Sequence, residues 1–128
     1  MIVTRTLQPS TKDHPMFTLF IGTERNAAGE SIRPLLRRKA IQEIKREALD
    51  RFGGYSASIV FGGWRDASGA VVEEKVLRLE VSIPPVSGTT SLLYGQRVLA
   101  SSFAIHCRGL LNQSSVLLVE PGQPDCFV

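Results

Sequence analysis

The side chains best suited to ligand chemistry lie in the segment GGWRD at residues 62–66. Trp64 offers a flat aromatic face and Arg65 a forked cation, and this pair of groups suits planar or anionic ligands. The same segment also suits an architectural role, in which the glycines bend a strand, the tryptophan covers a hairpin and Asp66 caps the turn. Both interpretations place Trp64 and Arg65 at the end of a hairpin.

A second polar segment, TERN at residues 23–26, follows a predicted strand. Thr23 and Arg25 are expected near the end of the sheet that carries Trp64 and Arg65, although a segment of this kind is often only a turn. These four residues form the predicted ligand-binding site. The predicted ligand is a small anionic or nucleotide-like molecule.

No catalytic residue is predicted, because the sequence contains no P-loop, no dinucleotide-binding glycine motif and no nucleophile elbow. His106 fits a hydrogen-bonded histidine of the core, and His14 precedes a proline in a predicted loop. Cys107 and Cys126 lack the spacing of a structural zinc site. We therefore expect no cofactor and no metal, and favour a non-catalytic protein over an enzyme.

Hydrophobic periodicity predicts six regular elements that position these residues. In the order β-α-β-β-α-β they lie at about residues 16–23, 32–52, 55–61, 71–83, 91–113 and 116–119. This order predicts an α+β fold of the ferredoxin-like type, a four-stranded antiparallel sheet with two helices on one face. Residues 1–15 are expected to form an N-terminal arm, and residues 16–128 a single domain.

Side-chain spacing also predicts how these elements face the core and where the first helix begins and ends. Ser31 is the expected N-cap of that helix, and Gly53 and Gly54 are expected to end it with a residue in the left-handed conformation. The core face of the strand after the first helix is predicted to hold Tyr55, Ala57, Ile59 and Phe61. The core face of the second helix is predicted to hold Leu92, Leu99, Phe103, His106, Cys107 and Leu110.

The second helix has only two charged residues, Arg97 and Arg108. Tyr94, Val98 and Ile105 are expected on the side away from the sheet, and a helix that is apolar on two sides needs two partners. The second partner is the first helix, the N-terminal arm or another copy of the chain. We favour another copy, and hence a homo-oligomer that self-associates through these three residues.

The net charge of +3 comes from residues 33–51, where seven basic side chains stand against three acidic ones. One interpretation is an electrostatic surface for nucleic acid, formed by Arg37, Arg38, Lys45 and Arg46. The favoured interpretation is a solvated helix face with ion pairs at a spacing of four residues. Residues 74–79 lack the stacked aromatics of an RNA-binding sheet, so that mode of recognition is not expected.

Several short motifs lie between about residues 16 and 120: FTLFIG at 17–22, FGGYS at 52–56, GWRDASG at 63–69, VEE at 72–74 and QSSVLLVE at 113–120. They resemble those of a group of small uncharacterised proteins of bacteria, plasmids and phages. The most visible shared feature is a hairpin of the form G-x-W-x-x-x-x-G-x-x-x-E. The resemblance implies a ferredoxin-like fold and no established activity, so no catalytic residue is carried over.

The sequence therefore predicts a non-catalytic oligomeric binding module, such as a phage or plasmid sponge for a nucleotide signal. One alternative is a dimeric ferredoxin-like enzyme with His106 or Glu80 in a cleft between subunits, and another is the nucleic-acid binder described above. The first fifteen residues lack a secretory signal pattern, and no apolar run is long enough to span a bilayer. We expect a cytoplasmic protein with reduced thiols and no membrane partner.

Overall fold

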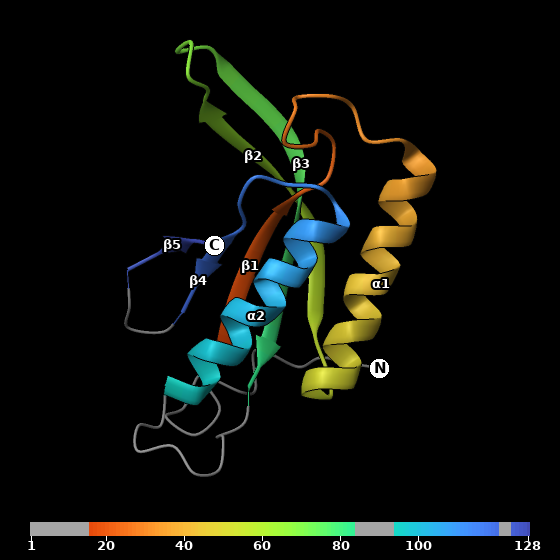
Figure 1. Cartoon of the computed structure of the whole chain (residues 1–128), viewed down its shortest axis with the longest axis vertical. Coiled ribbons are helices and arrows are strands. Elements are labelled where there is room, and N and C mark those ends of the chain that lie inside the picture. Colours follow the sequence, from red (N-terminus) through yellow and green to blue (C-terminus); the bar gives the residue numbers. More distant parts are fainter. Residues whose placement is uncertain (1–15, 84–93, 121–123) are drawn as a thin grey trace.

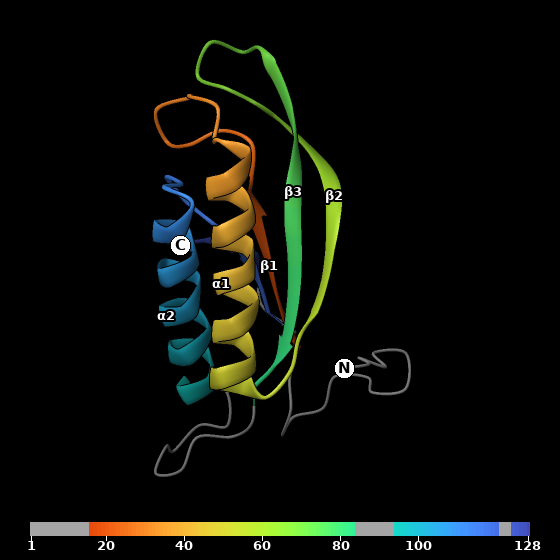
Figure 2. The same cartoon turned by 90° about the vertical axis from the view of Figure 1, so that its right-hand side faces the viewer.

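Five strands form one layer and two helices form the other (Figure 1). The computed structural model describes residues 16–83, 94–120 and 124–128. The elements, in chain order, are β1 (Met16–Gly22), α1 (Pro34–Phe52), β2 (Ser56–Arg65), β3 (Val71–Ser82), α2 (Tyr94–Leu110), β4 (Leu117–Val119) and β5 (Cys126–Phe127). The strand order is β2-β3-β1-β4-β5, and every neighbouring pair is antiparallel. Both helices cover the same face of the sheet (Figure 2).

The predicted α+β class and the two helices on one face are confirmed, but the predicted number of strands is wrong. The added strand is β5, whose two residues pair with Leu117 and Leu118 of β4. Val116 and Val128 extend this pairing by exchanging backbone hydrogen bonds of 2.8 and 2.9 Å. A strand of two residues is too short to show an alternating pattern, so periodicity did not reveal it. The predicted N-terminal arm lies outside the described residues.

The core lies between the helices and one face of β1 and β3. Leu19 faces Leu79 and Ile21 faces Leu77 across the two strands, and all four side chains are buried. Their alternation with polar or half-buried neighbours explains why these segments form strands with one apolar face. The helices add buried apolar side chains to the same core: Ala40, Ile44, Ala48, Ala100, Phe103, Ala104 and Cys107.

The predicted core face of β2 is only half correct. Tyr55 and Ala57 pack against the core, but Ile59 is exposed and Phe61 is 80 % exposed. This exposure follows from the tertiary structure. β2 is the outermost strand at its edge of the sheet, and α1 packs on β3 instead of on β2. The β2–β3 hairpin also extends past the N-terminal end of α1 (Figure 2).

The predicted start of α1 is wrong and its predicted end is confirmed. Arg33, not Ser31, is the N-cap residue, and it makes no side-chain capping bond. Ser31 instead pairs with Arg25 in a short β-bridge. At the other end, Gly53 has φ +82° and donates its N–H to the carbonyl of Leu49, which is the left-handed ending that favours glycine.

The core face of α2 also differs in part from the prediction. Phe103 and Cys107 are buried as expected, but Leu99 is exposed and Gln96 is buried in its place. Leu92 lies outside the described residues. No helix of the described ranges is long and apolar enough to cross a membrane.

The two cysteines are expected to differ strongly in reactivity. Both are free thiols; Cys107 is buried in α2, whereas Cys126 is exposed in β5. Burial raises the pKa of Cys107 to about 12, so almost none of it is thiolate at neutral pH. A thiol-specific chromogenic reagent should modify one cysteine in the native protein and both after unfolding in urea. Rapid modification of two thiols under native conditions would contradict this packing.

Candidate functional site

A cavity of about 600 Å³ lies on the face of the sheet that the helices leave uncovered. Directly opposed residues in antiparallel pairs share a face, and the strand registers build its floor from two rows of side chains. One row joins Val60, Val76 and Gly22. The other joins Phe20, Leu117 and Phe127. This volume and its largely apolar lining suit a small organic ligand.

Aromatic rings from three strands line the cavity. Phe20 comes from β1, Phe61 and Trp64 from β2, and Phe127 from β5. Trp64 is 44 % exposed, so part of its indole surface is accessible to a ligand. Sequence analysis missed Phe127, because its contribution depends on a two-residue strand that pairs with β4.

Gly22 allows two polar side chains to meet at one end of the cavity. A β-carbon at this position would lie 2.6 Å from Oε1 of Gln113 and 2.8 Å from Oε1 of Glu74. Both distances are shorter than van der Waals contact, so only glycine lets the amide and the carboxylate approach together at this point. All three residues line the cavity.

Backbone groups of the loop after β1 hold this carboxylate in place. Oε2 of Glu74 accepts hydrogen bonds of 3.2 Å from the N–H groups of Glu24 and Arg25. The side chain is only 5 % exposed, and in the described part of the chain its Oε1 accepts no hydrogen bond. Glu74 therefore presents one fixed carboxylate oxygen to a donor in the cavity.

The amide of Gln113 is held from two sides as well. Its Nε2 donates to the carbonyl of Arg25 at 2.6 Å and to that of Leu111 at 3.1 Å. These bonds leave the amide oxygen beside Gly22, next to Glu74. Both residues lie in motifs noted in the sequence, but neither was predicted to bind a ligand, because they are 39 positions apart and meet only through the sheet.

Of the four predicted ligand-binding residues, Trp64 and Arg65 line the cavity, whereas Thr23 and Arg25 are not part of its lining. Arg65 donates from Nη1 to the carbonyl of Gly69 at 2.9 Å, so its guanidinium partly closes the hairpin turn. Thr23 is buried and donates its hydroxyl to the carbonyl of Lys75. The backbone of Arg25 instead holds Glu74 and Gln113.

The architectural role predicted for Asp66 is confirmed. Its Oδ1 accepts hydrogen bonds from the N–H groups of Ser68 and Ala70 and from the Ser68 hydroxyl. The hydroxyl bond is the main reason that the pKa of Asp66 is lowered. This turn fixes the hairpin on which Trp64 and Arg65 stand.

The residues proposed for an enzyme with a cleft between subunits lie away from this cavity. Glu80 is buried and pairs with Arg78 at 2.5 Å. His106 lies on α2, near Glu43 and Glu47 of α1. Neither residue lines this cavity or the hollow on the outer side of α2, so these two hollows give that alternative no support.

The outer side of α2 carries an open hollow lined by Arg97, Val98, Ser101, Ser102 and Ile105. Val98 is 51 % exposed and Ile105 is 49 % exposed, as predicted for a surface that faces away from the sheet. The side chain of Tyr94 lies outside the described part of the structure. Two of the three predicted self-association residues therefore share one apolar surface.

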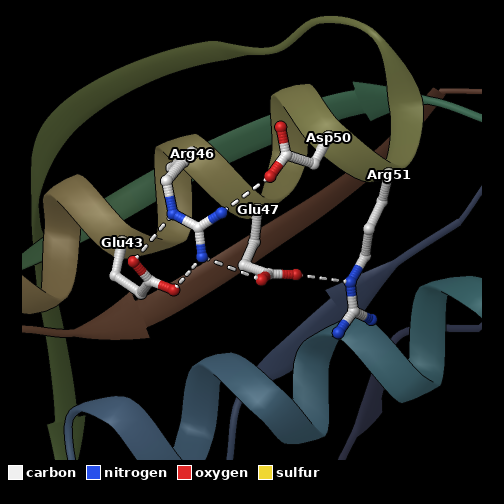
Figure 3. A network of polar contacts seen from close by, with 5 residues as sticks. All are labelled: Glu43, Arg46, Glu47, Asp50 and Arg51. Atoms are coloured by element: carbon white, nitrogen blue, oxygen red, sulfur yellow. Dashed lines mark hydrogen bonds and ion pairs between the residues drawn. The ribbon is translucent and has the colours of Figure 1, made fainter.

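Ion pairs on α1 occupy part of its basic face (Figure 3). Arg46 contacts Glu43, Glu47 and Asp50, and Arg51 contacts Glu47. Two of these pairs, 46–50 and 47–51, have the predicted spacing of four residues. They support the interpretation of a solvated, ion-paired helix face, because Arg46 is already neutralised by carboxylates.

Comparison with known proteins adds evidence on the fold. No protein-family model and no curated protein matches the sequence, so the resemblance to small bacterial, plasmid and phage proteins stays a prediction. A solved structure of a phage SAM lyase in the apo state matches with a TM-score of 0.62 and 13 % identity, over 94 % of this chain and 93 % of that one. The chain shares the fold of that lyase.

A phage SAM lyase in complex with S-methyl-5'-thioadenosine matches with a TM-score of 0.60 and 16 % identity. The match covers 95 % of this chain and 94 % of the other. At such low identity the likeness establishes the fold alone. CutA from Synechococcus elongatus PCC7942 is also similar, with a TM-score of 0.48 and 10 % identity over 88 % of this chain and 80 % of that one.

Proposed function

We propose that the cavity on the helix-free face binds a thioadenosine compound of the S-adenosylmethionine type. The observation that carries this proposal is the combination of aromatic walls with one fixed carboxylate at the polar end of the cavity. The fold shared with phage SAM lyase, one structure of which holds S-methyl-5'-thioadenosine, supports it.

The lining favours a neutral or cationic nucleoside over a phosphate. Trp64 can stack on an adenine ring, and aromatic faces also attract a sulfonium cation. Glu74 can accept a hydrogen bond from a ribose hydroxyl or an ammonium group, but it repels phosphate. Among the described residues of the lining, Arg65 is the one basic side chain, and the hairpin turn already occupies its Nη1. The proposal thus narrows the predicted ligand from an anionic or nucleotide-like molecule to an uncharged or positive nucleoside.

Calorimetric titration of the full chain with three ligands tests this proposal. S-methyl-5'-thioadenosine and S-adenosylmethionine should bind, and ATP should bind at least about tenfold more weakly, since its phosphates would approach Glu74. Equal or tighter binding of ATP would contradict the charge argument. The absence of heat with all three ligands would contradict the proposal itself.

Cleavage of S-adenosylmethionine is a second candidate function, and the position of Glu74 favours it. A carboxylate oxygen without a partner among the described residues can hold the ammonium group of the substrate, while aromatic rings surround the sulfonium. Attack by the substrate's own carboxylate on the carbon bonded to sulfur would break the carbon–sulfur bond and close the amino-acid chain into a lactone. The electron pair of the broken bond stays on sulfur, which converts the sulfonium to the neutral thioether of S-methyl-5'-thioadenosine. That loss of charge gives the site a physical means of releasing the product.

Chromatography of S-adenosylmethionine incubated with the protein separates the two candidates. Cleavage predicts that S-methyl-5'-thioadenosine accumulates faster than in buffer alone, and that Glu74→Gln slows its formation. A rate equal to that of buffer alone would exclude cleavage and leave ligand binding as the function, in agreement with the non-catalytic module predicted from the sequence.

We also propose that a second copy of the chain covers the outer side of α2. Val98 and Ile105 are about half exposed, and burial of apolar surface stabilises a contact by about 25 cal/mol per Å². In a symmetric dimer each residue contributes twice.

Val98→Asp is accordingly expected to lower the mass measured by light scattering while the chain remains folded. Val71→Asp is the matched control, because Val71 is an exposed valine at the far end of the hairpin and outside the α2 hollow. A wild-type mass of one subunit at micromolar concentration would contradict self-association.

A further inference from the structure

Three potential metal ligands meet between the two helices, on the face of the sheet opposite the cavity. Glu43 and Glu47 lie one turn apart on α1, and His106 lies on α2. One ligand atom from each residue lies within 4.8 Å of the other two. Two carboxylates and an imidazole from different elements form a ligand set of the kind that binds Zn²⁺ in proteins.

The imidazole of His106 carries a further sign of a missing contact. Its Nε2 is buried and has no hydrogen-bond partner in residues 16–83, 94–120 and 124–128. A buried polar atom without a partner costs free energy, and such an atom in a native fold calls for an explanation. A metal ion bound to Nε2 would satisfy it, because neutral imidazole binds metals through a ring nitrogen.

Arginines already contact both carboxylates, and these contacts are compatible with a metal ion (Figure 3). Arg46 bonds to Glu43 and lies 3.1 Å from Oε1 of Glu47, and Arg51 donates from Nε to Oε2 of Glu47 at 2.8 Å. Each carboxylate oxygen has two lone pairs, so an oxygen can accept a hydrogen bond and still have capacity for another contact. Groups that hydrogen-bond to metal-binding carboxylates orient them for coordination.

The local charge also allows a cation. Glu43, Glu47 and Asp50 carry three negative charges, whereas Arg46 and Arg51 carry two positive ones. The cluster therefore retains one negative charge when His106 is neutral. Binding of a divalent ion would reverse the sign of this small net charge, so the ion would not have to enter a cluster that is already positive.

We propose that Glu43, Glu47 and His106 bind one divalent transition-metal ion, with Zn²⁺ as the probe, and that this ion links α1 to α2. The three protein ligands leave the fourth position of a tetrahedral ion to water. No metal was expected from the sequence. The ligand set was not evident there, because His106 lies 59 residues from Glu47 along the chain. The proposal does not depend on the function of the cavity.

Calorimetric titration of the full chain with Zn²⁺ tests the proposal, with Cys126→Ser as the background because an exposed thiol also binds zinc. We expect one ion per chain. His106→Gln should weaken binding by at least about tenfold. His14→Gln, the matched control for the other histidine, should leave the affinity unchanged. Equal affinity in the two histidine variants, or no binding below millimolar Zn²⁺, would overturn the proposal.

Thermal unfolding gives a second readout that keeps the test decisive if His106→Gln folds poorly. The Glu43 side chain is 36 % exposed, so Glu43→Gln should retain the circular dichroism spectrum of the parent chain. An ion that binds only the native state raises the unfolding midpoint. Zn²⁺ should therefore raise the midpoint of the parent chain and raise that of Glu43→Gln much less. An equal rise in both chains would overturn the proposal.

Discussion

Phe103→Asp is expected to unfold the chain. Phe103 is fully buried in α2, where its ring stands perpendicular to that of Phe52 with centroids 5.2 Å apart, and the Arg51 guanidinium lies 5.6 Å from its centroid. Truncation of a buried phenylalanine to alanine costs about 3–5 kcal/mol, and an aspartate adds the cost of a buried charge. The total stability of a domain is about 5–15 kcal/mol, so the loss is comparable to the whole.

Urea titration followed by circular dichroism measures this loss. Val98→Asp is the matched control, because it places the same charge on the same helix at a half-exposed position. The control should retain the native spectrum in the absence of urea, although it is expected to dissociate the oligomer. A native spectrum and an unchanged urea midpoint for Phe103→Asp would contradict the assignment of this ring to the core.

Trp64→Ala is expected to weaken the binding of S-methyl-5'-thioadenosine by about 5- to 150-fold. Stacking of a base on an aromatic ring contributes about 1–3 kcal/mol, and each 1.4 kcal/mol changes the affinity tenfold. The hairpin should keep its form in this variant, since the turn is held by the bonds to Asp66 and not by the indole.

Val71→Ala provides the control for this effect. Val71 is an exposed apolar residue of the same hairpin, pairs with Arg65 and does not line the cavity. Its affinity for the ligand, measured by calorimetry, should equal that of the parent chain. Equal affinities for Trp64→Ala and Val71→Ala would show that the indole does not contact the ligand.

The elements that could be predicted from the sequence are those specified by local pattern. The alternation in β1 and β3 reflects one buried face, and Gly53 marks the end of α1 through its own backbone preference. Exposure of Phe61 could not be predicted in this way, because it depends on which strand α1 covers. The two residues of β5 likewise depend on a partner strand that is already in place.

The residues of the candidate site also differ in whether the local sequence identifies them. Trp64 and Arg65 could be identified because residue type alone suggests a role in binding, and both line the cavity. Glu74 and Gln113 could not, because their proximity depends on the pairing of β1 with β3 and on the missing side chain of Gly22. A glycine inside a strand pattern is a signal of close approach, but it does not identify the groups that approach.

The fluorescence of Trp64 tests the central claim most directly, because it is the only tryptophan in the chain and it lines the cavity. Titration with S-methyl-5'-thioadenosine should change the emission in a saturable way, with the same midpoint as the calorimetric titration. Adenine stacked on the indole alters the environment of that ring directly. Emission that stays constant while calorimetry reports saturation would place the ligand elsewhere and contradict the proposed site.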